Sequence, residues 1–537
     1  MKTCPSTREP RAGPVRSRRR GSVLFLGLIV SILILLAMVA AVSTSVTLGR
    51  EAKYKIDRTQ ALAAAEGTTE RAQKLILEQV SNFEPPTLTG TVTLGGIAHP
   101  YTITPIGASS IHVDSDGITR TIQHYQISSD VQTGDGFATV DRIVDLTVTP
   151  LFQFMIFSDD DLEILPGPSM TLGGRVHANG NLYVGSGGTL TVDTEYFRAT
   201  GDILRKRKND NSEATGDVNI KVKGETSYVD MDNAHDAEYS DWTNYALSTW
   251  KGTVQDGAHG VREIAAPDIK TIKAFQPDGS KGFFHEHADL VIVDSNAYDG
   301  DGNPVSLPPG TITTKNMFDA REGKNIRLSE VNVGLLNTSG RFPANGLIYA
   351  YRTDASTTHP NGIRLTNGSE ILRPLTVVSE DPVFVRGDFN TVNKKGVAVI
   401  ADAVNLLSNS WNDTKNPASG LPNASNTTYN IAVVSGNVPT PDGGGNYSGG
   451  FENMPRFHEN WTGKTARIRG SFISLFDSEI AKSPWRYGGN VYTAPVRDWQ
   501  YDTALNDMNN LPPFTPSAVY FQRVLWDDRL PQILSGV

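Results

Sequence analysis

The stretch "RRRGSVLFLGLIVSILILLAMVAAV" (Arg18–Val42) places three arginines and a glycine directly before an unbroken apolar run. From Val23 to Val42 there are 20 residues without a charge. As a helix this run spans roughly 30 Å, the thickness of a bilayer's hydrocarbon. The apolar part of a removable secretion signal is typically about 7–15 residues long. The length therefore favours a retained membrane helix over a signal that is removed whole.

The helical pattern continues beyond the apolar run. No proline occurs between Arg50 and Phe83, and apolar residues recur there at three- and four-residue steps. Pro85 and Pro86 then end the helix. We therefore expect one helix over residues 22–84, with a transmembrane part at 23–42 and an amphipathic part that packs on a folded domain.

The distribution of charge predicts how this helix is oriented. Residues 1–20 carry a net charge of +6, which leaves about −15 on the rest of the chain. A basic leader (1–21) before a membrane helix stays on the cytoplasmic side. The acidic remainder argues against a nucleic-acid partner, which needs a basic face. We expect a single-pass inner-membrane protein whose bulk is periplasmic or at the cell surface.

Two parts of the N-terminal region carry a family resemblance. One is Gly21 between the basic leader and the apolar run, and the other is "QALAAAEGTTERA" (60–72). The second is similar to an Ala-Ala-Glu-Ala-Gly-Leu-Glu pattern through Ala64, Ala65, Glu66, Gly67 and Glu70. Over about residues 16–83 the chain resembles the type IV pilin superfamily, and within it the PilX-type minor pilins.

This resemblance implies processing and partners. A prepilin peptidase would cleave between Gly21 and Ser22, and the helix would remain as a membrane anchor and packing spine. Other pilin-like subunits and the pilus assembly machinery would be its partners. Major pilins carry a glutamate at the fifth mature position, which here is Leu26, so the resemblance implies a minor or tip component. A plain signal-anchor and a fully removed signal remain the alternatives.

The rest of the chain is expected to be mainly β. Residues 87–152 place apolar or β-branched residues at every second position, which predicts a small antiparallel sheet domain against the helix. In 153–411 short apolar pairs such as Leu182/Val184 and Leu190/Val192 alternate with Asn-Gly or Gly-Gly turns. This rhythm favours a β-solenoid (β-helix), and a β-sandwich is the alternative.

Three segments break this rhythm. Residues 205–265 are polar and predict an insertion with a short helix, 412–455 predict a loop-rich linker, and 456–537 form an aromatic-rich C-terminal region. Within the last, "WRYGGNVYTAPVRDWQYD" (485–502) could stack on sugars or a partner protein, although core packing is the simpler interpretation. The only cysteine, Cys4, precedes the apolar run, so no disulfide supports the exported part.

Catalytic motifs are not found, so no catalytic residues are assigned and no enzyme activity is expected. "SDDDLEI" supplies adjacent carboxylates at Asp159, Asp160 and Asp161, and a solvated turn is the simplest interpretation. The alternative is a membrane-anchored polysaccharide-acting enzyme on a β-solenoid. That alternative needs a groove in which these aspartates meet other acids.

Two short motifs have metal-ligand spacing. "DGDGNP" offers Asp299, Asp301 and Asn303 to a calcium ion, but it lacks the glycine and the closing glutamate of a calcium loop. "HEHAD" (285–289) would hold a zinc ion only if its two histidines and its aspartate share one strand face. Apart from calcium, no cofactor is expected.

The sequence thus predicts a minor pilin-like component or accessory of a type IV pilus or pseudopilus. It would be anchored in the membrane and display an exported β-rich module for assembly or adhesion. Besides the enzyme, the remaining alternative is a signal-anchored surface protein unrelated to pili.

Overall fold

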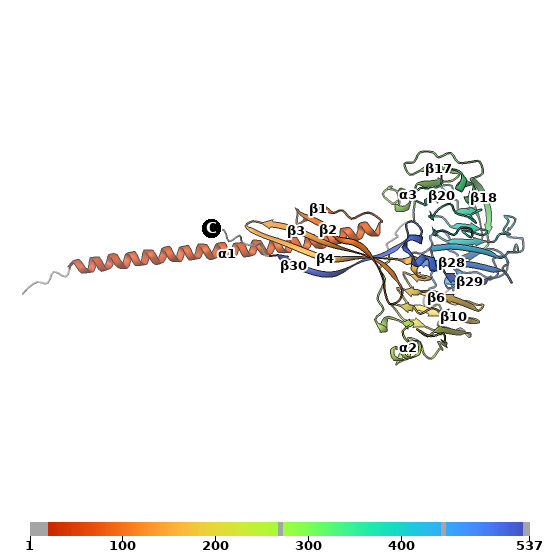
Figure 1. Cartoon of the computed structure of the whole chain (residues 1–537), viewed down its shortest axis with the longest axis horizontal. Helices are drawn as coiled ribbons and strands as arrows, with labels where there is room; N and C mark the ends of the chain where they lie inside the picture. The colour runs from red at the N-terminus through yellow and green to blue at the C-terminus, as the bar shows by residue number, and fades with distance from the viewer. Residues whose placement is uncertain (1–19, 267–271, 442–446, 530–537) are drawn as a thin grey trace, which may run out of the picture.

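The computed structural model describes residues 20–266, 272–441 and 447–529, and it is mainly β with one long N-terminal helix (Figure 1). Helix α1 (Arg20–Ser81) continues for 62 residues through Gly49, which gives a rod about 90 Å long. Every side chain from Val23 to Ile56 is exposed, and burial begins at Asp57. The expected single helix is therefore confirmed, with a bare first half and a packed second half.

A five-stranded antiparallel sheet packs against the second half of α1. Its order is β1-β2-β3-β4-β30. The strands are β1 (Thr89–Leu94), β2 (Ile97–Val113), β3 (Thr119–Thr133), β4 (Gly136–Pro150) and β30 (Ser517–Arg529). Small helix residues allow close approach, and Ala61, Ala65 and Ala72 are completely buried. The last strand that the structure describes thus completes the sheet that the first strands begin.

The turn between β3 and β4 touches the backbone of the helix. A Cβ at Gly136 would overlap the backbone of Asp57 and Arg58, so only glycine fits at this approach. The Asp57 carboxylate accepts a hydrogen bond from the backbone N–H of Asp135 at 3.1 Å. Backbone contact and hydrogen bond together fix where along the rod the sheet begins.

The remaining part of the chain, residues 151–516, is inserted into this sheet and is called the head below. Pro150 on β4 pairs directly with Ser517 on β30. The backbone N–H of Leu151 donates to the carbonyl of Pro516 at 2.9 Å. The head therefore begins and ends at the same point of the sheet.

The first part of the head coils with three strands per turn. Its strands are β5 (Ile156–Ser158), β6 (Leu162–Ile164), β7 (Met170–Gly173), β8 (Val176–Ala178), β9 (Leu182–Val184), β10 (Thr189–Asp193), β11 (Phe197–Ala199), β12 (Ile203–Leu204), β13 (Asp217–Lys221) and β15 (Val254–Gln255). Successive turns pair in parallel: Ile156 pairs with Val176, and Val176 pairs with Phe197. Leu182, Val184, Leu190 and Val192 are completely buried, so the predicted apolar pairs form the core.

The second part of the head forms two parallel ladders. One contains β16 (Leu290–Val293), β20 (Leu347–Tyr351), β22 (Leu375–Ser379), β24 (Val397–Ala401), β26 (Thr427–Ser435), β28 (Thr465–Ser474) and β29 (Val496–Tyr501). The other contains β19 (Lys324–Asn332), β21 (Asn361–Thr366), β23 (Val383–Arg386), β25 (Val404–Leu407) and β27 (Arg456–Phe457). Parallel pairing between successive turns favours a solenoid over a sandwich, whose hairpins pair antiparallel.

Antiparallel strands and short helices cover the ends and corners of the head. The strands are β14 (Tyr228–Asp230), β17 (Asn296–Asp299) and β18 (Ile312–Asp319). The α-helices are α2 (Trp242–Trp250), α3 (Phe283–His287) and α4 (Val333–Thr338). The 3-10 helices are η1 (Leu151–Gln153), η2 (Gly257–His259), η3 (Phe451–Asn453), η4 (Thr503–Asn506) and η5 (Met508–Asn510).

The two parts of the head meet at β28. This strand pairs in parallel with β26, β29 and β5, so the end of the second part stacks on the start of the first. The Ser471 hydroxyl donates to the carbonyl of Phe154 at 2.6 Å across this seam. Helix α1 and the five-stranded sheet, together called the stalk below, join the head beside this seam. The coiled strands of the head extend to both sides of the stalk axis (Figure 1).

The order of segments along the coil differs from the expectation at two places. Strand β26 lies inside 412–455, the range expected to be a loop-rich linker. Within 456–537, β28 and β29 form the middle of the head and β30 belongs to the small sheet. Because turn residues dominate the composition of 412–455, they hide the short apolar strand "YNIAVVS" (429–435). Pairing between remote segments also leaves no local signal.

A single methyl group at Gly136 tests the contact between helix and sheet. Gly136→Ala should lower the free energy of unfolding by about 1–3 kcal/mol, because the backbone of Arg58 cannot move away without bending the helix. Limited proteolysis at rising temperature should show earlier cleavage of the β3–β4 turn. Gly167→Ala is the matched control, since a Cβ there meets no atom within 4 Å. Equal protease resistance of the two variants would contradict the contact.

Candidate functional site

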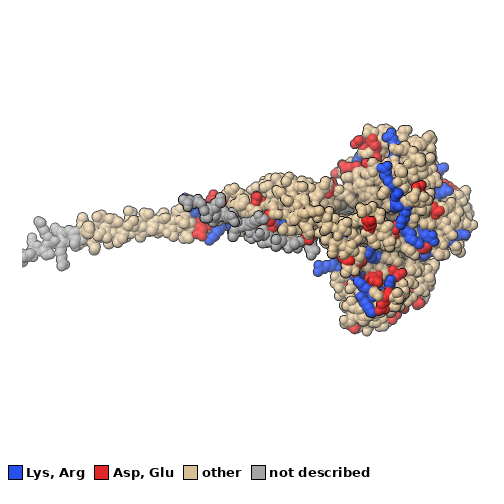
Figure 2. All heavy atoms as spheres, viewed as in Figure 1, with Lys and Arg blue, Asp and Glu red and all other residues tan. Residues whose placement is uncertain are grey.

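The bare half of α1 is one candidate site. It is a helix long and apolar enough to cross a membrane, and none of its most apolar stretch is buried. From Val23 to Gly49 the helix contains no Lys, Arg, Asp or Glu, and Figure 2 shows this outer part of the rod without charged side chains. Gly21 and Ser22 lie in the first turn of α1, and cleavage between them stays a prediction. Leu26 is exposed on the same bare segment.

The pilin-like motif lies where the helix meets the sheet. Ala65 is completely buried and packs in one cluster with Val131, Val140 and the partly buried Ala64. A Cβ at Gly67 would lie 3.1 Å from the Leu94 side chain.

The polar members of the motif face a residue that the sequence did not single out. The buried side chain of Arg142 on β4 donates to the Glu66 carbonyl at 3.5 Å and lies 3.6 Å from the Glu70 carboxylate. Alternation on β4 predicts which of its residues face the helix, but it does not predict this ion pair.

Charged and aromatic contacts hold the head on the stalk. Asp116, in the turn between β2 and β3, accepts from Arg198 at 2.9 and 3.1 Å and from Lys223 at 2.9 Å. Burial raises the pKa of the Asp116 carboxyl, but these two cations outweigh it and lower that pKa overall. The ring of Phe83, just past the end of α1, stacks on Phe283 at 5.5 Å. These contacts fix the head to the stalk at several points around the neck, which is the junction at Pro150 and Ser517.

A second candidate site is a cavity of about 290 Å³ at the seam of the head. On one side it is lined by residues 158–163 of the first part, and Lys208 extends over this wall. On the other side it is lined by segments 437–440, 449–454 and 474–477 of the second part. Leu162 and Glu163 of β6 line the cavity, and β6 is an end strand of its three-stranded sheet, so this wall of the cavity lies at a sheet edge.

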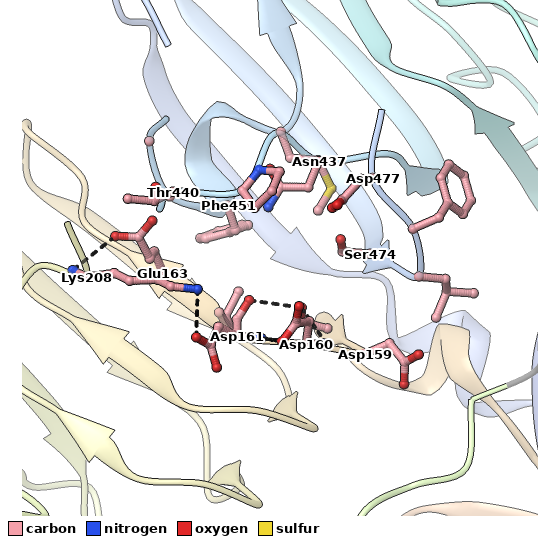
Figure 3. Close-up of a pocket in the computed structure, with 18 residues that line it drawn as sticks. Asp159, Asp160, Asp161, Glu163, Lys208, Asn437, Thr440, Phe451, Ser474 and Asp477 are labelled. Carbon is pink, nitrogen blue, oxygen red and sulfur yellow. Dashed lines mark hydrogen bonds and ion pairs between the residues drawn. The ribbon is translucent and has the colours of Figure 1, made fainter. Parts of the chain in front are cut away.

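The cavity brings the three predicted aspartates together with other acids (Figure 3). Asp159 and Asp160 are exposed as expected for a turn, while Asp161 forms an ion pair with Lys208 at 2.7 Å. Glu163 and Asp477 complete the acidic lining. The sequence did not predict either role. Glu163 belongs to the same stretch as the three aspartates but was not singled out, whereas Asp477 comes from a remote segment that no local pattern connects to them.

Burial and like charges perturb the acids of the cavity. Burial raises the pKa of Glu163 to about 7, and the nearby Glu452 carboxylate adds to the rise. Burial, and then the facing Asp160 carboxylate, raise the pKa of Asp477, while Lys208 opposes this rise. The cavity is therefore acidic but not fully ionised near neutral pH.

The predicted calcium loop forms a tight turn after β17. The Asp299 carboxylate accepts hydrogen bonds from the backbone and side chain of Asn303, at 2.8 and 3.1 Å. Among the residues that the structure describes, no group of three or more His, Cys, Asp and Glu is placed to hold a metal ion. Calcium at Asp299, Asp301 and Asn303 stays a prediction, checked by a calcium-dependent thermal shift that Asp301→Ala abolishes.

The structure also describes the histidine motif at 285–289 and the aromatic segment 485–502. "HEHAD" begins in helix α3 rather than on a strand, and the Nδ1 atoms of His285 and His287 bond to the carbonyls of Ala274 and Phe283. In the 485–502 segment Trp499 is buried in the core, whereas Trp485 is half-buried and Tyr487 is exposed, so core packing describes only part of the segment.

Comparisons with known proteins add little to this description. No family model and no curated protein matches the chain. The crystal structure of competence-associated pilin ComZ from Thermus thermophilus aligns over 88% of this chain and 97% of its own. The identity is 12% and the TM-score is 0.28. At that TM-score the likeness does not establish a common fold, so the function is argued from this chain's own residues.

The raised pKa of Glu163 predicts a specific pH dependence. The folded chain holds a proton on Glu163 up to about pH 7, whereas the unfolded chain loses it near 4.5. The contribution of Glu163 to the free energy of unfolding is therefore fully present below pH 4.5 and is lost as the pH rises through 7. The loss is on the order of 3 kcal/mol. Relative to Glu163→Gln, the thermal midpoint of the unchanged protein should fall between pH 5 and pH 8. Parallel midpoints in the two proteins would contradict the burial of this carboxyl.

Proposed function

We propose that this chain is a minor, tip-type component or accessory of a type IV pilus or pseudopilus. One observation carries the proposal: a single unbroken helix is bare and apolar in its first half and docked on an antiparallel sheet in its second. A bend near Gly49 would separate anchor from domain, and α1 has none. The PilX-like motif around Glu66 lies in this docking region.

The orientation and partners follow from the same segment. The basic leader keeps the N-terminus cytoplasmic, so the head is exported to the periplasm or cell surface. A prepilin peptidase would act at Gly21, and pilin-like subunits would pack on the bare helix. Leu26 offers no carboxylate to the amino terminus of a neighbouring subunit, which favours a position without that neighbour. A head that projects to both sides of the stalk also fits the end of a filament better than its side (Figure 1).

A second candidate function concerns the cavity. A membrane-anchored enzyme acting on polysaccharide needs Asp159–Asp161 beside other acids, and Glu163 and Asp477 meet that requirement. We favour display over catalysis, because Asp161 is held by Lys208 rather than free to act. Release of new reducing ends from a polysaccharide, abolished by Asp160→Asn, would favour the enzyme instead.

Processing at Gly21 tests the proposed function directly. Edman sequencing of the membrane-extracted protein should give Ser22 as the first residue. Gly21→Leu, or loss of the prepilin peptidase, should leave the leader in place, and Gly27→Ala should not affect cleavage. A mature chain that begins at Met1 would exclude this processing and favour a plain signal-anchor.

A headless chain tests whether stalk and head are separable. Because Pro150 pairs with Ser517, replacing 151–516 by Asn-Gly closes β4 and β30 into a two-residue hairpin. The shortened chain should insert in the membrane and co-purify with pilin-type subunits. The matched control ends at Pro150, and it should be degraded because β4 loses its neighbour. Degradation of both chains would show that the stalk depends on the head.

A further inference from the structure

The cavity at the seam has polar groups that the fold does not use. The amide of Asn437, the hydroxyl of Ser474 and the carboxylate of Asp477 line it, and no side-chain hydrogen bond joins any of them to another described residue. Figure 3 shows Ser474 and Asp477 on one wall and Asp160 on the other. An amide, a hydroxyl and two carboxylates therefore face one space with both donors and acceptors available.

An aromatic surface adjoins this cavity and is called the aromatic ledge, defined by Tyr447, Trp485 and Tyr487. Trp485 and Tyr487 stack with ring centroids 6.0 Å apart and an angle of 24°, and Tyr487 is 56% exposed. Tyr447 meets the Trp485 ring edge-on at 5.7 Å. The guanidinium of Arg207 lies 5.2 Å from the Tyr447 ring, and the next residue, Lys208, lines the cavity. Gly449, two residues after Tyr447, also lines the cavity, so the ledge begins beside the cavity wall.

We propose that the cavity and the aromatic ledge bind an uncharged or amine-bearing hexose chain. Sugar hydroxyls donate and accept hydrogen bonds, which matches the mixed groups contributed by Asn437, Ser474 and Asp477. Flat aromatic rings offer area for the apolar faces of sugar rings, with little side-chain entropy to lose. A cavity of about 290 Å³ is near the lower limit of small-molecule sites, which suits one sugar unit with the chain continuing over the ledge.

The charge of the site selects among glycans. Asp160 and Asp477 line the cavity, whereas the charge of Lys208 is already paired with Asp161. A negative wall repels uronate polymers and nucleic acids, and it attracts an amino sugar. The inference goes beyond the anchoring role and depends only on the head.

The test is titration calorimetry on the full chain in lipid nanodiscs, which avoids detergents with sugar head groups. The probes are cellohexaose, chitohexaose, the glucosamine hexamer and hexagalacturonate. At least one of the first three should bind. Asn437→Ala and Tyr487→Ala should each weaken that binding about tenfold, because each removes a direct contact.

Matched controls separate the site from general effects. Asn325→Ala on β19 and Tyr228→Ala on β14 change exposed residues that do not line the cavity, and they should leave binding unchanged. The proposal would be overturned if none of the first three probes bound at millimolar concentration or if hexagalacturonate bound more tightly than they do. It would also be overturned if Asn437→Ala and Tyr487→Ala bound the sugar as tightly as the unchanged protein. The variants should still be processed at Gly21, so loss of sugar binding leaves the pilus assignment unaffected.

Discussion

The rest of the structure depends on the close contact between α1 and the turn that joins β3 to β4. Glycine at 136 lets one backbone lie on another, and Asp57 closes the contact with a hydrogen bond. Because buried alanines continue this contact along the helix, the sheet cannot slide or rotate on the rod without losing packing. The apolar helix and the domain packed on its second half therefore behave as one stiff body.

The insertion of the head between two neighbouring strands explains the remaining architecture. A chain that leaves β4 and must return to β30 has to bring its last turns back beside its first. The first part of the head coils away from the neck, and the second part coils back until β28 pairs with β5. On one face the ladder continues through this seam, and on another it is interrupted. The acidic cavity lies at this seam, where segments of both parts of the head supply its walls.

Local patterns predicted local structure well. The charge-free run and the later three- and four-residue steps predicted α1, and alternation predicted most strands of the small sheet. The apolar pairs Leu182/Val184 and Leu190/Val192 were predicted to mark short strands of a solenoid, and all four residues are buried. Pairing across long separations was not predictable, as with Ser471 and Phe154, because no residue type marks its partner. For the same reason Asp159–Asp161 could be interpreted as a turn but not as one wall of a cavity that Asp477 completes.

The position of the neck has a mechanical consequence. Tension between a surface-bound target and the membrane would enter the stalk through Pro150 and Ser517, which are side by side. The force then acts along β4 and β30. The hydrogen bonds between these two strands share it in shear and do not break one after another. The coil itself lies outside this load path. A target gripped at the seam, close above the neck, would exert little leverage and leave the turns of the head undistorted.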